Sequence, residues 1–535
     1  MAPNGRELTP MDTSRTSPWL PRSAAFAAAF VGLVNIGSSL TPNIRWRGHL
    51  LLQYEPIQAI RMFHALALPA GAALLLVAPY LLKRRRRAWQ MAILLMVALG
   101  LFDLLKGFDF EESLFTWSVA SALAFAGASF KVHSDPIRLK SALWRAPLLA
   151  AGGLAVAVLA SWASHPDSVQ VTAVVTLLAV AYVVFRPLAA PRKLPGSESR
   201  AAAAQLVQDH GTDTLSFFKL RGDKHYFFSD QRDAFVGYRI ENGVLLLSGD
   251  PVGAPEAFPG LIEQLQTFAE TRGLRLGAIG AHERLCPLYE QFGYRTIYLG
   301  DEAIIELDEF SLEGRPIRKV RQSVTRLTKA GYTAELHAFA QLDDQTLREV
   351  ERVLELGREG APERGFSMTM DRIDGDHADE TLVLLAKDEQ DQLRGVLHFV
   401  PCYGRATVSL SFMRRDPDTP NGLTEFMVCS AVELLKEREL KELSLNFATF
   451  ARYMHSPHTR LERLLGWTAK KFNPYFQIES LYRFNAKFFP RWEARYLVYE
   501  GALGLPRAGL AAAWAEGQVW KPALPERRRP QQLAA

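Results

Sequence analysis

The sequence predicts an α-helical membrane bundle of about six spans, followed by a cytoplasmic α/β region built twice on one plan. Apolar stretches fill the first third of the chain, and charged residues return at globular density after about residue 196. A hairpin, a turn, a helix and a strand then follow one another twice. We divide the chain into a cytoplasmic N-terminal segment (1–22), a transmembrane region (23–188), a linker (189–200), a two-lobed domain (201–500) and a C-terminal tail (501–535).

Six apolar stretches have lengths close to the roughly 17–25 residues that cross a hydrocarbon core. They are Ser23–Leu40, Phe63–Leu82, Trp89–Leu104, Leu114–Phe130, Ala146–Ala163 and Val169–Val184. Lysines and arginines gather after the second, fourth and sixth stretches, so the positive-inside rule puts these exits in the cytoplasm. The expected location is therefore the bacterial inner membrane, with several spans and the two-lobed domain on the cytoplasmic side.

Composition argues against several kinds of site. Cys286, Cys402 and Cys429 lack CxxC spacing, and the twelve histidines form no helical HxxxH pair, so neither a disulfide framework nor a metal site is predicted.

The first apolar stretch resembles a signal peptide, but five further stretches favour a retained anchor. The tail ends in a basic cluster, Arg527–Arg529, and we interpret it as solvated.

The first repeat begins with the alternating run Ala234–Leu247, which the turn Glu241–Gly243 divides into a hairpin. The hairpin ends at the sequence Gly249-Asp250-Pro251. A helix over Pro259–Thr271 and a buried strand over Leu274–Ile279 are expected next.

The second repeat follows the same order. Its elements are the strands Arg394–Val400 and Ala406–Phe412, an Asp416-Pro417 turn, a helix over Leu423–Glu437 and a strand over Glu442–Asn446. This order resembles the core of the GNAT acyltransferase fold, which implies two tandem GNAT-like lobes; two unrelated α/β pieces are the alternative. Neither Asp-Pro turn has the glycine spacing of an acetyl-CoA loop, and Asp250 or Asp416 would repel a diphosphate. Acetyl-CoA is therefore disfavoured as the donor.

A basic helix is expected between Gly314 and Gly331. One face carries cations and a glutamine, and the other is apolar. The basic face comprises Arg315, Arg318, Lys319, Gln322, Arg326 and Lys329. Such a face is often only solvated. Because it contains no carboxylate, we favour a phosphate-rich partner, either a tRNA backbone or a lipid headgroup.

Several short segments together resemble one family. The run Gly249–Gly253 is similar to the GDPVG segment of aminoacyl-phosphatidylglycerol synthases, the multiple peptide resistance factor family, in its actinobacterial branch. Further segments agree in order: Leu299–Ala303, Phe310–Gly314, Glu363–Ser367, Met413-Arg414 and Lys487–Trp492. The segments Asn421–Met427 and Ser444–Ala448 are the ones that look more like the actinobacterial branch. The likeness covers about Ala201–Tyr499.

The resemblance implies an aminoacyltransferase that moves an amino acid, lysine first, from aminoacyl-tRNA to a hydroxyl of a membrane phospholipid such as phosphatidylglycerol. It implies no cofactor, because the aminoacyl ester is already activated. Ser411 stands where the family typically has an aspartate, which leaves alanine open as the amino acid. Two other functions stay open: a non-catalytic membrane protein that binds lipid or a partner, and Fem-like transfer to a peptidoglycan precursor.

Three catalytic residues are predicted. Glu363 would contact the aminoacyl ammonium or assist deprotonation, Arg414 would clamp phosphate, and Lys487 would meet phosphate or an oxyanion. A surface ion pair of Arg414 with Asp416 or Asp418 is the alternative. The general base stays unassigned.

Further residues are candidates for substrate binding. They are Asp250, Glu302, Arg318, Lys319, Arg326, Ser411 and Asn446. Asp250 has the alternative of capping its turn, and Glu302 that of a plain residue at the start of a strand. For the aromatic residues Phe484 and Trp492 beside Lys487, core packing is the favoured interpretation.

Overall fold

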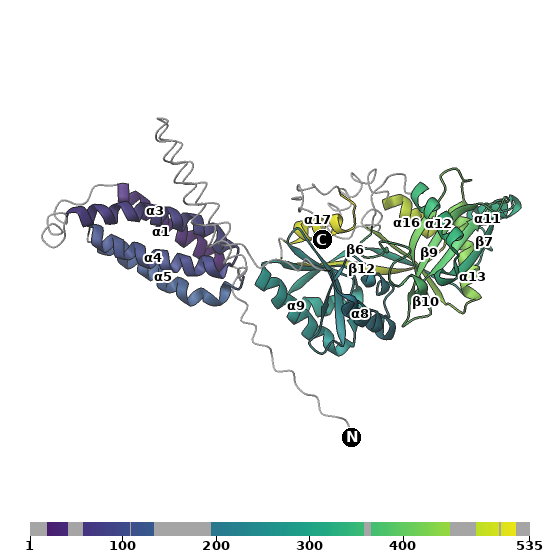
Figure 1. The fold of residues 1–535 in the computed structure, drawn as a ribbon, viewed down its shortest axis with the longest axis horizontal. Coiled ribbons are helices and arrows are strands. Elements are labelled where there is room, and N and C mark those ends of the chain that lie inside the picture. Colours follow the sequence, from purple (N-terminus) through teal and green to yellow (C-terminus); the bar gives the residue numbers. More distant parts are fainter. Residues whose placement is uncertain are drawn as a thin grey trace, which may run out of the picture. The chain divides into compact units, whose positions relative to one another are not determined.

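The computed structural model describes residues 19–40, 57–107, 109–132, 194–357, 365–449, 478–501 and 504–519 (Figure 1). The chain divides into two compact units. The first comprises Met1–Ala190 with Phe268–Leu274, and the second Pro191–Thr267 with Arg275–Ala535. Each unit is described by itself.

The first unit is helical. Its described elements are α1 (Leu20–Leu40), α3 (Ile57–Leu82), α4 (Arg86–Gly107), α5 (Phe110–Phe125) and the short 3-10 helix η1 (Ala126–Ser129). They correspond to the first four predicted apolar stretches. Among the described residues, two helical stretches are long and apolar enough to cross a membrane, Leu20–Ser38 and Arg86–Leu105. The stretches Ala146–Ala163 and Val169–Val184 lie outside the described residues, so the count of six spans stays a prediction.

The second unit has two lobes joined in one sheet. The first lobe contains α8 (Ser197–His210), η2 (Phe217–Leu220), β1 (His225–Phe228), β2 (Ala234–Glu241), β3 (Val244–Ser248), β4 (Val252–Gly253), η3 (Pro255–Ala257), α9 (Phe258–Arg272), β5 (Arg275–His282), η4 (Glu283–Leu285), α10 (Cys286–Gln291) and β6 (Tyr294–Glu306).

The second lobe contains the next set of elements. They are α11 (Arg318–Lys329), β7 (Thr333–Ala338), η5 (Phe339–Gln341), α12 (Asp344–Leu356), η6 (Ala378–Glu380), β8 (Leu382–Lys387), β9 (Leu393–Cys402), β10 (Thr407–Arg415), α13 (Leu423–Lys436), β11 (Glu442–Thr449) and α16 (Ile478–Ala486). The strand β12 (Arg491–Glu500) and the helix α17 (Leu505–Ala515) end the described chain.

The predicted repeat is present in both lobes. In the first, the β2–β3 hairpin is followed by α9 and by β5, which pairs with β3 in parallel. In the second, the β9–β10 hairpin is followed by α13 and by β11, which pairs with β10 in parallel. The predicted turn between β2 and β3 holds Asn242 and Gly243 at φ +49° and +71°, as a tight hairpin requires.

The two lobes exchange their last strands. The sheet order is β1-β2-β3-β5-β12-β6-β11-β10-β9-β8-β7, with β4 paired to β2. Thus β12, from the end of the second lobe, lies beside β5 of the first, and β6 lies beside β11. The lobes therefore cannot separate without breaking a strand ladder on each side.

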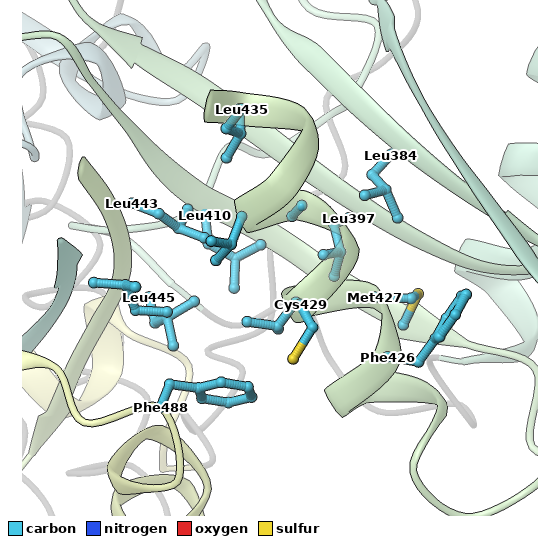
Figure 2. Packing of buried hydrophobic residues seen from close by; sticks show 14 of the residues in the cluster. Leu384, Leu397, Leu410, Phe426, Met427, Cys429, Leu435, Leu443, Leu445 and Phe488 are labelled. Carbon is cyan, nitrogen blue, oxygen red and sulfur yellow. The ribbon is translucent and has the colours of Figure 1, made fainter. Parts of the chain in front are cut away.

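The largest core cluster of the second lobe lies between α13 and the sheet. Figure 2 shows Met427 and Cys429 of α13 near leucines of the neighbouring strands, with Phe488 beside Leu445. Val320 and Leu327 of α11 belong to the same cluster. The predicted apolar face of the basic helix is therefore buried.

Helix α17 changes the predicted domain boundary. Four of the five alanines of this helix are buried in a cluster with residues of α8, β2, β3 and β12. They are Ala508, Ala511, Ala512 and Ala515. The prediction of a solvated tail over 501–535 is therefore wrong for 504–519, because small side chains on one face let the helix pack closely on the sheet. At the other end, α8 begins at Ser197, inside the predicted linker.

Candidate active site

The parallel strands of the second lobe stop pairing before they end. Their ladder stops at Ser409 and Ser444, although both strands continue. Strand β10 then bulges between Leu410 and Phe412, and β11 shifts its register against β6 after Ser444. We call residues 410–415 and 445–449 the open end of the second lobe. Bulges of this kind are frequent beside active sites.

Ser411 and Asn446, both predicted from the sequence, meet at the open end. Ser411 is buried, and its hydroxyl accepts a hydrogen bond from the amide of Met370 at 3.1 Å. Asn446 has φ +64°, and its amide nitrogen donates to the carbonyls of Met368, at 3.0 Å, and Leu410. Its Oδ1 is buried and has no hydrogen-bond partner among the described residues. A ligand that donates a hydrogen bond would satisfy this oxygen.

His398 is a buried polar residue near the same place that sequence reasoning missed. It pairs with Phe412 across β9 and β10, and the two rings lie 5.4 Å apart. Neither ring nitrogen has a hydrogen-bond partner among the described residues. Burial lowers the pKa of His398 to about 3, so the imidazole is neutral at physiological pH. Its only sequence signal was a histidine inside an apolar strand.

Arg414 lies within β10 rather than after it. Its guanidinium donates to the Met413 carbonyl at 3.0 Å. The neighbouring carboxylate of Asp416 pairs with Arg394 at 3.0 Å and with Arg352 at 3.8 Å. Asp416 thus forms ion pairs with these two other arginines, and the role of Arg414 in phosphate binding stays a prediction.

Lys487 follows α16 and is tied to α13. Its Nζ lies 2.6 Å from a carboxylate oxygen of Glu425 and 5.2 Å from the centre of the Phe484 ring. Phe484 and Trp492 pack against the core of the second lobe, as favoured from the sequence. The Lys487 side chain remains 43% exposed, so its ammonium is accessible to an anion.

The basic helix α11 presents its cations to solvent. Arg318, Lys319, Arg326 and Lys329 of the helix are exposed, and so is Arg315, which precedes it. Within the described residues, none of these five makes an ion pair. A shallow hollow of about 380 Å³ lies on the helix and is lined by Arg321, Gln322, Thr325, Arg326 and Lys329. This face is suited to phosphate groups.

The N-terminus of α13 adjoins this basic face. Arg326 donates to the carbonyl of Asn421, just before α13 begins. Gly422 takes φ +93°, and a Cβ there would lie 2.7 Å from the Ser323 hydroxyl, so this close approach requires glycine.

Asp250 and Glu302 are buried, and Glu302 lies on β6 opposite Phe447 of the open end. Asp250 accepts a hydrogen bond from the His282 amide at 3.1 Å, across the end of β5. Glu302 is fully buried and accepts hydrogen bonds from Ser444 and Arg495. Both carboxylates thus have partners within the protein, and their predicted contact with substrate stays untested.

Arg495 is the centre of this buried network, and sequence reasoning missed it. Its side chain is 1% exposed. It donates to Asp213 at 2.7 Å, to Thr214 at 2.9 Å and to Glu302 at 2.8 Å. Although burial opposes the effect, the Arg495 and Lys219 charges hold the pKa of Asp213 well below its usual range. The network joins β12 to β6 and to the segment after α8.

Two further points concern the predicted site. Glu363 lies outside the described residues. Among the residues that the structure describes, no cluster of three or more histidine, cysteine or acidic side chains is arranged to hold a metal. The structure therefore brings Ser411 and Asn446 together, keeps Arg318, Lys319 and Arg326 on one helix, and gathers Asp250 and Glu302 around Arg495.

Curated proteins from actinobacteria resemble this chain. The lysylphosphatidylglycerol biosynthesis bifunctional protein LysX of Rhodococcus jostii is 36% identical over 359 residues, which are 65% of this chain and 32% of that protein. The protein of the same name from Mycobacterium sp. (strain JLS) is 30% identical over 571 residues, 93% of this chain and 50% of that protein. The chain thus spans about a third to a half of the length of these relatives.

Two solved structures share the fold of the second unit. L-PGS from Bacillus licheniformis is 23% identical with a TM-score of 0.55, over 62% of this chain and 99% of that one. The C-terminal domain of a putative lysylphosphatidylglycerol synthetase from Agrobacterium fabrum is 24% identical with a TM-score of 0.52, over 60% of this chain and 98% of that one.

The family model covers the same part of the chain. The model described as phosphatidylglycerol lysyltransferase, C-terminal, matches residues 204–499. This range includes both lobes, the exchanged strands and every predicted site residue. Since the match extends over more than half of the chain, the chain belongs to the phosphatidylglycerol lysyltransferase family.

Proposed function

We propose that this chain is a membrane-bound aminoacyltransferase that moves a lysyl group from lysyl-tRNA to a hydroxyl of phosphatidylglycerol. The family match over residues 204–499 is the observation that carries the proposal. The name of the relatives, lysylphosphatidylglycerol biosynthesis bifunctional protein, supports lysine as the amino acid and phosphatidylglycerol as the acceptor.

The proposed reaction is a transesterification. The lipid hydroxyl oxygen attacks the ester carbonyl, a new ester bond forms, and the bond from the carbonyl carbon to the tRNA ribose oxygen breaks. The proton of the lipid hydroxyl passes to the departing ribose oxygen. The ester is already activated, so the protein has to orient both substrates, assist proton transfer and stabilise the oxyanion.

The second lobe is the proposed place of transfer. Its open end combines the buried acceptor Oδ1 of Asn446, the hydroxyl of Ser411 and the cation Arg414 on one pair of strands. Asn446 Oδ1 is suited to receive an N–H of the lysyl group, and Arg414 and Lys487 are suited to phosphate and oxyanion. Glu363 remains a candidate for ammonium binding or proton transfer on the basis of the resemblance.

Helix α11 is the proposed contact for the tRNA backbone. Its four exposed cations and Arg315, just before the helix, have no ion-pair partner among the described residues, and a hollow on its surface is lined by three basic side chains. Lysines and arginines that neutralise phosphates release counterions, so binding through this face should depend strongly on salt.

The first unit is proposed to anchor the enzyme in the inner membrane with about six spans. Two described apolar helices of spanning length support an anchor, and the lysines and arginines after the second, fourth and sixth stretches support a cytoplasmic second unit. This location would bring tRNA and the inner lipid leaflet to the same site.

Membranes containing the full chain test the proposal. Radiolabelled lysyl-tRNA should yield a labelled lipid that comigrates with lysylphosphatidylglycerol, and RNase treatment of the donor should abolish the label. Labelling that resists RNase but requires an acyl-CoA would contradict the proposal. Lipid binding without transfer from any aminoacyl-tRNA would favour the non-catalytic alternative, and a labelled peptidoglycan precursor would favour the Fem-like one.

A further inference from the structure

We infer that the C-terminal helix α17 belongs to the transfer site, because Glu516 at its end holds residues 365–370 across the open end of the second lobe. We call residues 365–370 the bridging segment. The kinetic part of this inference rests on the proposed function, whereas its structural part concerns contacts that are measurable without turnover.

One residue anchors the start of the bridging segment. The Glu516 carboxylate accepts hydrogen bonds from the amides of Phe366, at 2.7 Å, and Ser367, at 3.0 Å, and from the Ser367 hydroxyl at 2.6 Å. The Glu516 carbonyl accepts a fourth from the amide of Gly365 at 3.1 Å. Glu516 is 3% exposed. Hydrogen bonds to a buried carboxylate are roughly twice as strong as neutral ones, so this anchor is firm.

Cations of the first lobe surround the same residues. Arg221 donates to the carbonyls of Gly365 and, at 2.9 Å, Thr369. The Lys224 ammonium lies 4.6 Å from the centre of the fully buried Phe366 ring, and the Arg239 guanidinium lies 5.2 Å from it. The start of the bridging segment is therefore held from two sides.

Gly365 allows the chain to turn at the anchor. It takes φ +101°, and a Cβ added there would collide with the Thr369 side chain. Glycine adopts this backbone conformation without steric cost, so the segment can bend sharply where Glu516 receives it.

The other end of the bridging segment contacts the two residues that the proposed site requires. The Met368 carbonyl accepts from the Asn446 amide group at 3.0 Å, and the Met370 amide donates to the Ser411 hydroxyl at 3.1 Å. The bridging segment is thus hydrogen-bonded to Glu516 at its first three residues and, through Met368 and Met370, to both strands of the open end. A shift of the segment would reorient Asn446 and Ser411.

Helix α17 is itself docked firmly. Its alanine face is buried, and Arg507, near its start, donates from Nε to the Asn242 carbonyl in the β2–β3 turn at 2.8 Å. Glu516 therefore acts from a rigid element of the first lobe upon the open end of the second, which makes it a positioning residue.

The test compares two variants of the same helix in the full chain. Glu516→Gln keeps the shape but turns one acceptor into a donor that faces backbone N–H groups. Arg507→Ala removes a hydrogen bond of the same helix that is remote from the bridging segment. Hydrogen exchange at the amides of Phe366 and Ser367 should become faster in Glu516→Gln and stay unchanged in Arg507→Ala.

The kinetic expectation separates positioning from binding. For Glu516→Gln we expect kcat for lysyl transfer to fall about tenfold or more while the KM for lysyl-tRNA stays within about twofold, because small misplacements of reacting groups reduce turnover rather than binding. Arg507→Ala should keep both constants. Ser367→Ala removes only the hydrogen bond from the Ser367 hydroxyl to Glu516, so kcat should fall less than in Glu516→Gln. If Glu516→Gln does not fold, the kcat of Ser367→Ala decides whether the anchor positions the site.

Two results would overturn the inference. One is a folded Glu516→Gln with wild-type kcat. The other is equal acceleration of exchange at Phe366 and Ser367 in both α17 variants, which would indicate general loosening of the helix. A wild-type chain that transfers no aminoacyl group would instead contradict the proposed function, while the exchange comparison would still test the anchor.

Discussion

The two lobes repeat one plan but finish their parallel strands differently. In the first lobe β3 pairs with β5 along its whole length, and beyond it the Gly249 amide still donates to the Ile279 carbonyl at 2.8 Å. In the second lobe the ladder of β10 and β11 stops at Ser409 and Ser444, and both strands continue without it. The same structural unit thus occurs twice in one sheet, once with its parallel strands fully paired and once with them separated at the end. We call the paired end of β3 and β5, with Gly249 and Asp250, the closed end.

The polar groups at the two strand ends differ in the same way as the strand pairing does. Asp250, after β3, accepts from the His282 amide of β5 and so fastens the closed end. Asn446, at the open end, has a buried oxygen without a hydrogen-bond partner in the described part of the chain. At these two strand ends, therefore, the first-lobe carboxylate is used within the fold, whereas the second-lobe amide oxygen retains hydrogen-bonding capacity.

The largest expected effect concerns the buried Arg495 network, which joins residues of both lobes through Asp213, Glu302 and Ser444. Arg495→Met leaves the buried carboxylates of Asp213 and Glu302 without their cation, and we expect a loss of about 3–5 kcal/mol in unfolding free energy. Urea unfolding of the detergent-solubilised full chain, followed by tryptophan fluorescence, measures it.

Arg491→Met is the matched control on the same strand. Arg491 also pairs with carboxylates, but its side chain is 42% exposed, so the expected loss is about 1 kcal/mol or less. Equal losses for the two arginines would show that burial of the Arg495 network contributes little.

The next effect concerns the basic face of the second lobe. Replacing Arg318, Lys319 and Arg326 by glutamine keeps helix propensity nearly level and removes three charges. If these cations bind tRNA phosphates, the slope of log affinity for lysyl-tRNA against log salt should shrink by about two to three units, at about 0.7–0.9 per contact. Filter binding across a salt series measures the slope.

A first-lobe triple variant controls for net charge. Arg232, Arg284 and Arg295 are exposed arginines of the first lobe, and their replacement by glutamine removes the same charge. We expect the salt slope of this first-lobe variant to match that of the wild type. A slope unchanged in the α11 variant would remove this helix from the tRNA site.

A smaller effect is expected from the pH dependence of the closed end. Burial and the nearby Asp213 carboxylate raise the pKa of Asp250 from 3.8 to about 6. The folded state then binds the proton more tightly than the unfolded state, so this group makes stability fall as pH rises through that window. The stability of Asp250→Asn relative to the wild type should therefore increase as the pH rises from about 4 to about 6. Thermal midpoints at stepped pH test this, and a constant difference would contradict it.

Local patterns predicted much of the second unit. The Asn242-Gly243 turn and the apolar face of α11 each depend on neighbours a few residues apart, and both were found as expected. The family resemblance was also confirmed. Such features are readable because turn chemistry and helical periodicity are local properties of the chain.

The pairing of strands that are distant in the sequence could not be predicted in this way. The exchanged strands β6 and β12 pair residues about two hundred positions apart, for example Arg495 with Gly300. The role of Arg495 depends on Asp213 and Glu302, which its own strand does not reveal. Helix α17 looked like a tail because its alanines carry little hydrophobic signal, yet their small size suits close packing.

The most direct measurement compares a matched pair of polar deletions, one in each lobe. Asn446→Ala removes hydrogen bonds to Met368 and Leu410 at the open end. Ser229→Ala removes hydrogen bonds to Asp233 and Ala234 in the turn after β1. Both should cost about 1–3 kcal/mol of stability.

Lysyl transfer from lysyl-tRNA to phosphatidylglycerol, measured in membranes at equal amounts of folded protein, decides between the lobes. The account predicts that Asn446→Ala lowers kcat about tenfold or more, a difference of about 1.4 kcal/mol in activation free energy, while Ser229→Ala stays within about twofold of the wild type. Equal losses in the two variants, or a larger loss in Ser229→Ala, would contradict the assignment of the transfer site to the second lobe.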